Sequence, residues 1–578
     1  MVLPTVAARE LESCRFLLQG QAKILADRLY GPEGPAAGTA LDEIETAVGA
    51  VALELRKRVL DLVMARQAEA MHQHLSEELR RCPSCGQETI PQDPLPRVLH
   101  CRGITVEWME PRRYCGHCRR DFFPQSKALG IDLGHYSISL LNVIVYAGAN
   151  KVSFREATKD LQVMAGEEVK EKQVERLTKR IGQERLAERD AEVRHFAGLP
   201  LVQRCEETPA GVEPPGDDQV AAVMADAGML QIRDTPVEPG ELEKTLSSVA
   251  GALEKEEPEL VEDDDDQDKP PSGRHWREDK VGLVMTMKSS VSESDPCPQI
   301  PETFVDPQRV SRIVRGLKKS AALRAEEETD PESPTDPALE KEVEESLEKS
   351  EYQGPKLEKR RVVASRQNWP VFGVILACAA WMAGYAKAKR KAFVADGARA
   401  IWRVWKSRFS SYTPILDFIH ALTYVYSAAK AVGRDDVERW RLYVEWIQWA
   451  WAGEVARVIE RLRQWQAEHG KPDKGETSNR SVVAKSLRYL TNNQDKMKYA
   501  EYRKQGLPIV SSLVESMVKQ ISRRVKGTEK FWSDDGAEAV IQLRADYLSD
   551  GDLMTNYWKR RQAAADGQRH YRYAHSCI

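Results

Sequence analysis

The chain has 578 residues, which is long enough for several domains with sizeable cores. No run of eighteen apolar residues occurs and the N-terminus lacks a signal-peptide pattern, so we expect a cytoplasmic protein without a membrane partner. The net charge of −4 averages two opposed regions. From Ser365 onwards there are 36 Lys and Arg against 22 Asp and Glu, whereas thirteen acidic residues fall between Glu238 and Asp268. Single charge runs are usually solvated faces, but an imbalance over a whole region indicates a phosphate-backbone partner.

Two helical patterns open the chain, a shorter one from about Val6 to Tyr30 and a long one over residues 41–81. In the second, Ile44, Val48 and Val51 begin a series at helical spacing. Residues 1–81 are therefore predicted to form an N-terminal helical region. It could dimerise or touch DNA, and a plain helical bundle is an equally good interpretation.

Four of the ten cysteines form two Cys-x-x-Cys pairs, Cys82 with Cys85 and Cys115 with Cys118. This spacing lets backbone amides fold toward the thiolates around one tetrahedral Zn²⁺. The apolar residues between the pairs suggest strands, so residues 82–124 are predicted to form a zinc ribbon. Four protein ligands leave no open position, which makes the Zn²⁺ structural. A redox pair is the rival interpretation, and no thioredoxin-like pattern surrounds either motif.

Residues 137–190 have a pattern typical of a helix-turn-helix-like DNA-binding region. Ser153 followed by Glu156 predicts a helix N-terminus, and Ala165-Gly166 predicts a turn. The helix that follows could enter a major groove, although any short helical pair would look similar. Its candidate DNA contacts are Arg176, Lys179 and Arg180.

Apolar runs alternate with helical patterns from about residue 218, which predicts an α/β core. Strands are expected at Val220–Asp226, Val281–Met287 and Lys391–Asp396, and a helix at Val371–Lys389. Inserts at about 235–275 and 289–360 are rich in Pro, Glu and Ser, so they are predicted to be disordered loops or frayed helices. Residues 426–505 are helical in pattern and rich in tryptophan. Such aromatics are usually core, and a helical insertion that packs against DNA ends is the functional alternative.

Three carboxylates lie in contexts typical of a metal site. Asp226 and Asp396 each close an apolar, strand-like run, and Glu515 begins a helical stretch rich in Lys and Arg. Hard cations prefer oxygen ligands, and two Mg²⁺ (or Mn²⁺) ions about 4 Å apart can clamp an in-line attack at phosphorus. A lone aspartate of this kind is more often a loop cap or an ion-pair partner.

Several strings together resemble bacterial insertion-sequence DDE transposases of the Mutator-like superfamily, Kra-type group. The strings are VMADAGM at 223–229, ADGA at 395–398, ILDFIHA at 415–421 and GLPIVSSLVES at 506–516. The family's Asp/Cys-x-x-His motif after the second aspartate matches Asp417 and His420. The chain departs from the family at Ser511-Ser512 and at Ala227, where glycines are common.

The resemblance implies a multidomain α/β protein with an RNase H-like core in two parts, 218–425 and 506–578, around the helical insertion. Asp226 would bridge two metal ions, Asp396 would hold one and Glu515 the other. Asp417 and His420 would support the site or simply pair with each other. Further phosphate contacts are expected from Arg523, Arg524 and Lys526.

The activity implied is Mg²⁺-dependent cleavage at transposon ends and strand transfer into target DNA. The expected partners are double-stranded DNA, both terminal repeats and target, and further copies of the chain in a synaptic complex, at least a homodimer. The setting would be bacterial cytoplasm, at the nucleoid when bound to DNA. Two alternatives are a domesticated DNA-binding protein with an inactive fold and an RNase H-like nuclease without strand transfer.

Overall fold

The computed structural model describes residues 8–568, with gaps at 33, 132–133, 234–274, 326–353, 474 and 528–529. The chain divides into two units, and each is described by itself. The first contains residues up to Thr178 and from Met554 onwards, and the second runs from Lys179 to Leu553. Residues 506–578, which were predicted to be one part of the core, are thus divided between the two units at Met554. Helix α21 (Leu553–Ala563) lies almost entirely in the first unit because it makes its contacts there.

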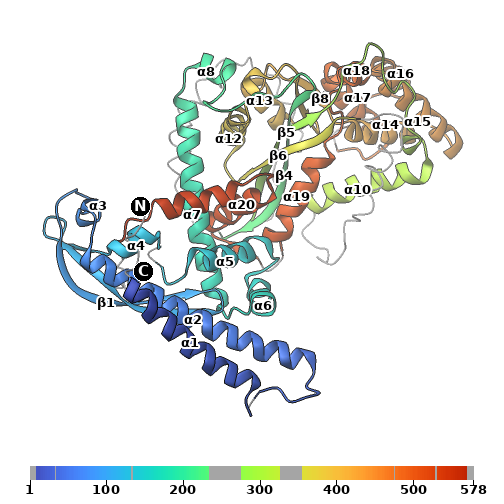
Figure 1. Ribbon diagram of the computed structural model, residues 1–578. Coiled ribbons are helices and arrows are strands. Elements are labelled where there is room, and N and C mark those ends of the chain that lie inside the picture. Colours follow the sequence, from blue (N-terminus) through green and yellow to red (C-terminus); the bar gives the residue numbers. More distant parts are fainter. Residues whose placement is uncertain are drawn as a thin grey trace. The chain divides into compact units, whose positions relative to one another are not determined.

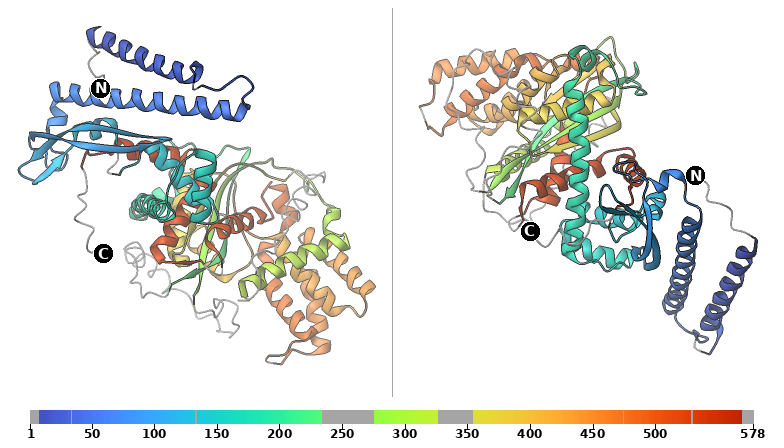
Figure 2. Two further views of the ribbon diagram at one scale, coloured as in Figure 1. Left: turned by 90° about the horizontal axis from the view of Figure 1, so that it is seen from below. Right: turned by 90° about the vertical axis from the view of Figure 1, so that its left-hand side faces the viewer.

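Two helices begin the first unit and lie side by side (Figure 2), α1 (Ala8–Tyr30) and α2 (Leu41–Gln73). The long helix predicted over 41–81 stops at Gln73, and the short helix α3 (Glu77–Arg80) follows after a break. Both helices keep many apolar side chains exposed, such as Phe16 and Leu41, each 78% exposed.

An antiparallel sheet follows, ordered β1 (Ile90–Cys101), β2 (Ile104–Cys115) and β3 (Arg120–Phe122). The strands expected between the cysteine pairs are thus confirmed. Val106 and Trp108 of β2 pack against Met64 and Ala68 of α2, which buries one face of the ribbon. Short helix α4 (Pro124–Leu129) closes this part.

Helices α5 (Ile138–Asn150), α6 (Phe154–Ala165) and α7 (Glu171–Gly198) come next. The predicted helix start and turn are confirmed, since the Ser153 hydroxyl accepts a hydrogen bond from the Glu156 amide and Gly166 ends α6 in a left-handed conformation. Helix α7 is longer than expected and passes from the first unit into the second. Val193 and Phe196, both buried, extend its apolar stripe beyond residue 190, where the predicted region ended.

The second unit is built on a mixed six-stranded sheet (Figure 1), whose main path is β6-β5-β4-β7-β8, with β9 paired to β4. Strand β4 runs antiparallel to β5 and parallel to β7, β5 runs antiparallel to β6, and β7 runs parallel to β8. The strands are β4 (Gln219–Ile232), β5 (Trp276–Lys288), β6 (Lys356–Ser365), β7 (Lys391–Ala395), β8 (Thr413–Leu416) and β9 (Phe531–Trp532). An α/β fold is therefore confirmed.

Helices cover both faces of this sheet. On one face, Val223 and Ala225 of β4 and Phe393 and Ala395 of β7 pack into one apolar core with α12 (Trp369–Met382) and α13 (Arg399–Arg408). Residues that alternate with these point to the opposite face. Helix α19 (Ser512–Val525) contacts β4 and β5, and α20 (Asp534–Leu548) contacts β6 and α19.

The predicted inserts are only partly loops. The first lies outside the described residues. Within the second, α10 (Pro307–Ala325) is a helix, which was one of the two forms expected, whereas the start of β6 at Lys356 contradicts the prediction. Strand β6 was missed because it lies at the sheet edge, where its first half exposes charged side chains and only Val362–Ser365 is buried. Residues 326–353 lie outside the described part.

The region predicted to be helical, 426–505, consists mainly of helices in its described residues, and its first helix begins earlier, at Phe418; these helices gather into one bundle (Figure 1). Trp446 and Trp451 are buried, which supports the interpretation of these tryptophans as core, while Trp449 and Trp465 are only half-buried. The helices are α14 (Phe418–Val432), α15 (Asp436–Trp451), α16 (Val455–His469), α17 (Asn479–Asn493) and α18 (Tyr499–Lys504).

Candidate metal centres

Asp417 is the most highly connected side chain of the candidate active site. It follows β8 and caps α14, and its carboxylate is completely buried. Oδ2 accepts a 2.8 Å hydrogen bond from the His420 amide and lies 2.7 Å from Nδ1 of the same residue. Oδ1 accepts a 2.7 Å bond from the Ser511 amide, just before α19. Asp417 therefore ties the end of β8, the start of α14 and the approach to α19 together.

Glu515 lies in the first turn of α19, with Oε1 4.0 Å from His420 Nδ1. Asp417, His420 and Glu515 each offer a ligand atom within 4.8 Å of the others, so this group could hold a metal ion. Burial raises the pKa of Glu515 to about 7, with the charges of Asp417 and Asp226 adding to the shift and His420 opposing it. A carboxyl in such negative surroundings gains from a bound cation.

His420 carries the counter-charge of the cluster. Burial by itself would lower its pKa, but the hydrogen bond to Asp417 and the charges of Asp417, Glu515 and Asp396 raise the pKa to about 10. The ring is therefore protonated at neutral pH and donates from Nδ1 to Asp417. Asp417 and His420 were expected either to support the site or to pair with each other. They do pair, and His420 also faces Glu515.

Asp226 and Asp396 follow the parallel pairing of β4 with β7. The last recorded pair is Met224 with Val394; Asp226 lies two residues further along β4, and Asp396 comes directly after the end of β7 at Ala395. Asp226 points to the face of α19, because Val223 and Ala225, which alternate with it in β4, face α12 and α13. Asp226 does not end its strand as expected, since β4 continues to Ile232 through its pairing with β5 and β9.

Electrostatic interactions link the two aspartates to the group formed by Asp417, His420 and Glu515. Asp226 acts electrostatically on Glu515, and Asp396 acts on His420. Neither aspartate belongs to the tight group formed by Asp417, His420 and Glu515, so the described structure brings three of the five predicted residues into ligand distance and the other two into their neighbourhood.

Asp279 is a carboxylate that the sequence patterns did not single out. It pairs across the sheet with Gly228, two residues from Asp226 and on the same face. It is completely buried, and among the described residues neither carboxylate oxygen has a hydrogen-bond partner. Burial raises its pKa to about 6. Asp279 stands among the charged residues Arg277, Glu278 and Lys280 in the first half of β5, so no sequence pattern distinguished it.

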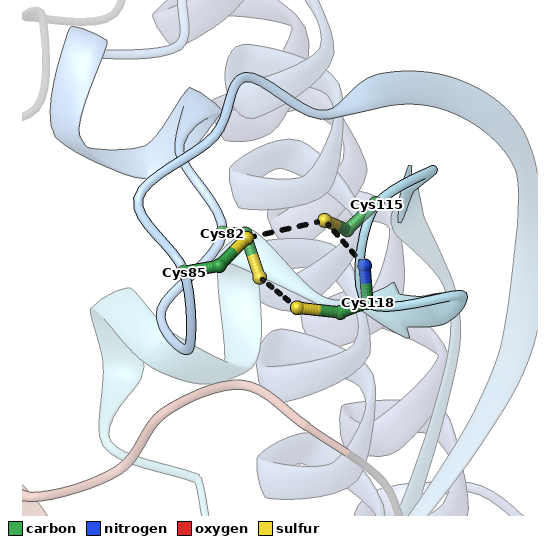
Figure 3. Close-up of side chains that lie close together, drawn as sticks. All are labelled: Cys82, Cys85, Cys115 and Cys118. Atoms are coloured by element: carbon green, nitrogen blue, oxygen red, sulfur yellow. Dashed lines mark hydrogen bonds between the residues drawn. The ribbon is translucent and has the colours of Figure 1, made fainter.

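The four predicted cysteines converge in the first unit (Figure 3). Cys82 Sγ lies 3.9 Å from Cys118 Sγ, and Cys85 Sγ lies 3.6 Å from Cys115 Sγ. Sulfurs 2.3 Å from a tetrahedral Zn²⁺ stand about 3.8 Å apart, whereas a disulfide needs about 2.0 Å. The cluster therefore has the spacing of a metal site.

The pKa values of these thiols shift in opposite directions, since that of Cys115 is lowered whereas the hydrogen bond with Cys85 and burial raise the pKa of Cys118 to about 12. The Cys118 amide donates a 3.4 Å hydrogen bond to Cys115 Sγ, and this bond is the main reason why the pKa of Cys115 is lowered to about 7. Thiolates rather than thiols are metal ligands. Cys82 and Cys115 are buried, and Cys85 and Cys118 are half-buried, so all four are shielded in part from solvent.

The candidate DNA contacts differ in exposure. Arg176 and Arg523 are exposed, while Lys179 lies over the ring of Trp532. Arg180 is half-buried, 3.9 Å from Glu184, and Lys526 is half-buried over the ring of Trp276. Arg524 is only 2% exposed and lies over the Trp532 ring. The prediction of a phosphate contact is therefore wrong for Arg524, which is a packing residue.

No helix among the described residues has the length and apolar character needed to cross a membrane. The chain matches no protein-family model, and no curated protein matches it either. What the two centres can do chemically therefore follows from their own residues.

Proposed function

We propose that this protein is a DDE-type DNA transposase, which cleaves DNA at transposon ends and joins the freed 3′ end to target DNA. The observation that carries the proposal is the cluster of Asp417, His420 and Glu515, with Asp226 and Asp396 close enough to act on its charges. The strand path, with antiparallel strands on one side of β4 and parallel strands on the other, is compatible with the RNase H-like core that the sequence resemblance implies.

The donor set suits hard divalent cations. Asp226, Asp396 and Glu515 supply oxygen ligands, which Mg²⁺ and Mn²⁺ prefer. The raised pKa of Glu515 supports the fit, because it reflects negative charge that a cation would neutralise. When bound, such ions activate the attacking oxygen and stabilise the leaving one.

The chain's own residues orient the site. Asp417 fixes the start of α19 through the Ser511 amide, and so fixes where Glu515 points. Protonated His420 offsets part of the negative charge before a metal ion arrives. The basic half of the chain, with a net charge of about +14 from Ser365 onwards, favours a polyanionic substrate.

The decisive test is cleavage of a labelled duplex that carries a candidate end, taken from the DNA flanking the reading frame, with Mg²⁺ or Mn²⁺. We expect 3′ nicks at the end from the wild type. Asp226→Asn or Asp396→Asn keeps side-chain size but removes the charge, so the rate should fall at least about 10³-fold, or about 4 kcal/mol of transition-state stabilisation.

Asp436→Asn is the matched control, because the Asp436 side chain is 95% exposed and outside the cluster. It should cleave like the wild type. Near-normal nicking by Asp226→Asn or Asp396→Asn would overturn the assignment of the protein as a DDE-type transposase. Cleavage of an RNA–DNA hybrid without end selection or joining would favour the nuclease alternative, and DNA binding without any cleavage would favour the inactive DNA-binding protein.

A further inference from the structure

The turn that carries Asp396 is tightly specified. Strand β7 ends at Ala395, and Asp396 Oδ1 accepts a 2.9 Å hydrogen bond from the Ala398 amide. Between them Gly397 has a φ of +101°, a conformation that residues with a side chain rarely adopt. The direction of the Asp396 carboxylate therefore depends on the conformation of this turn.

A tyrosine from the helical bundle lies directly against the turn. Tyr489 of α17 donates a 2.6 Å hydrogen bond from its hydroxyl to the main-chain carbonyl of Asp396. A Cβ on Gly397 would stand 2.8 Å from Cε2 and 2.9 Å from the hydroxyl of Tyr489. Glycine is required at position 397 because of its positive φ and because a side chain there would collide with the Tyr489 ring. The ring therefore packs closely against the turn.

Tyr489 is itself held on two sides. Its ring stacks on that of Tyr424 in α14, with centroids 3.6 Å apart and planes 11° from parallel. Its carbonyl accepts a 3.0 Å bond from the Asn493 side chain, which in turn accepts a 3.0 Å bond from Trp402 Nε1 of α13. The hydroxyl therefore reaches Asp396 from a rigid support.

We infer that Tyr489 is a positioning residue for the metal site. By holding the Asp396 carbonyl, it fixes the turn and so the direction of the Asp396 carboxylate toward the bound cation. The helical region 426–505 thereby sets the affinity of the site for divalent metal, in addition to any contact with DNA. This inference rests on the proposed function, since it takes Asp396 to be a metal ligand.

Residues that orient metal ligands commonly change metal affinity about 10- to 100-fold when they are altered. Tyr489→Phe in the full chain removes only the hydroxyl, so we expect Mn²⁺ binding, measured by titration calorimetry, to weaken about 10-fold. The Mn²⁺ concentration for half-maximal cleavage should rise by the same factor, and cleavage should recover at saturating Mn²⁺. The thermal unfolding temperature should change little.

Tyr502→Phe is the matched control. Tyr502 lies in the same bundle and also donates to a strand carbonyl, that of Pro414, at 3.2 Å. Its loss should leave Mn²⁺ affinity at the wild-type value. Equal affinities for the two variants would overturn the inference.

If Tyr489→Phe does not fold, Tyr424→Leu provides a second test. This substitution removes the Tyr424 ring, on which Tyr489 stacks, and leaves the hydroxyl of Tyr489 in place. We then expect a smaller weakening of Mn²⁺ binding, and wild-type binding would overturn the inference. Failure of the proposed function gives a different result, because wild type and Asp396→Asn would then bind Mn²⁺ equally poorly and neither would cleave.

Discussion

At the scale of single residues, Asp279 is expected to make the stability of the protein depend on pH. Its carboxylate is buried over Gly228, where the absence of a side chain leaves room for it. Its pKa is raised to about 6 by burial, so the folded chain holds this proton more tightly than the unfolded chain does. Stability contributed by the protonated form is present at low pH and is lost as pH rises toward and through about 6.

Asp279→Asn should therefore stabilise the protein at pH 7.5 by up to about 3 kcal/mol, and by clearly less at pH 4.5. Urea unfolding of wild type and variant at the two pH values measures this difference. The exposed control Asp436→Asn should show no such dependence. The same stabilisation at both pH values would mean that Asp279 is ionised in the folded state throughout.

At the scale of elements, the cysteine cluster joins the turn before β1 to the end of β2 and the turn before β3. A three-stranded sheet with one covered face buries little apolar surface, so a metal ion is the natural source of additional stability. The sulfur spacing fits Zn²⁺, which accepts four thiolates.

Purified protein should thus contain one equivalent of Zn²⁺ by elemental analysis, and Cys115→Ser should lose it together with the structure of residues 82–122. Cys101→Ser is the control, because Cys101 ends β1 outside the cluster. It should keep the metal. Well-folded wild-type protein without any metal would show that the four thiols only pack together.

At the scale of the whole molecule, charge is distributed unevenly along the chain, and the basic part should govern general affinity for DNA. Phosphate contacts release counterions, so binding of any duplex should weaken steeply with salt. Arg523 and Arg524 are neighbours with opposite exposure, which provides an internal comparison.

Arg523→Ala should reduce the slope of log affinity against log salt by about 1 without changing the unfolding temperature. Arg524→Ala should instead lower the unfolding free energy, by about 1 to 3 kcal/mol, because it removes packing against Trp532. Fluorescence anisotropy at several salt concentrations checks the first prediction, and urea unfolding checks the second. If the salt slope changed for Arg524→Ala but not for Arg523→Ala, Arg524 would be the phosphate contact and Arg523 would not.

Several features of this fold could be predicted from local sequence patterns. The Cys-x-x-Cys spacing, the Ser153 cap, the turn at Gly166 and the apolar strand at Val220 are determined by residues close in the chain. Short-range geometry determines these features, so they can be predicted without knowledge of the tertiary structure. The candidate carboxylates Asp226, Asp396 and Glu515 also came from sequence, through strings that resemble a family.

Tertiary structure alone decided the rest. Strand β6 is a strand because β5 pairs with it, and its charged residues hide that from any local pattern. Arg524 is buried although its neighbour is exposed, because helix phase and Trp532 decide which side chain packs. The hold of Tyr489 on Asp396 spans 93 residues. Sequence determined which groups could carry the chemistry, and long-range packing decided how they are held, because contacts between distant segments leave no periodic trace in the chain.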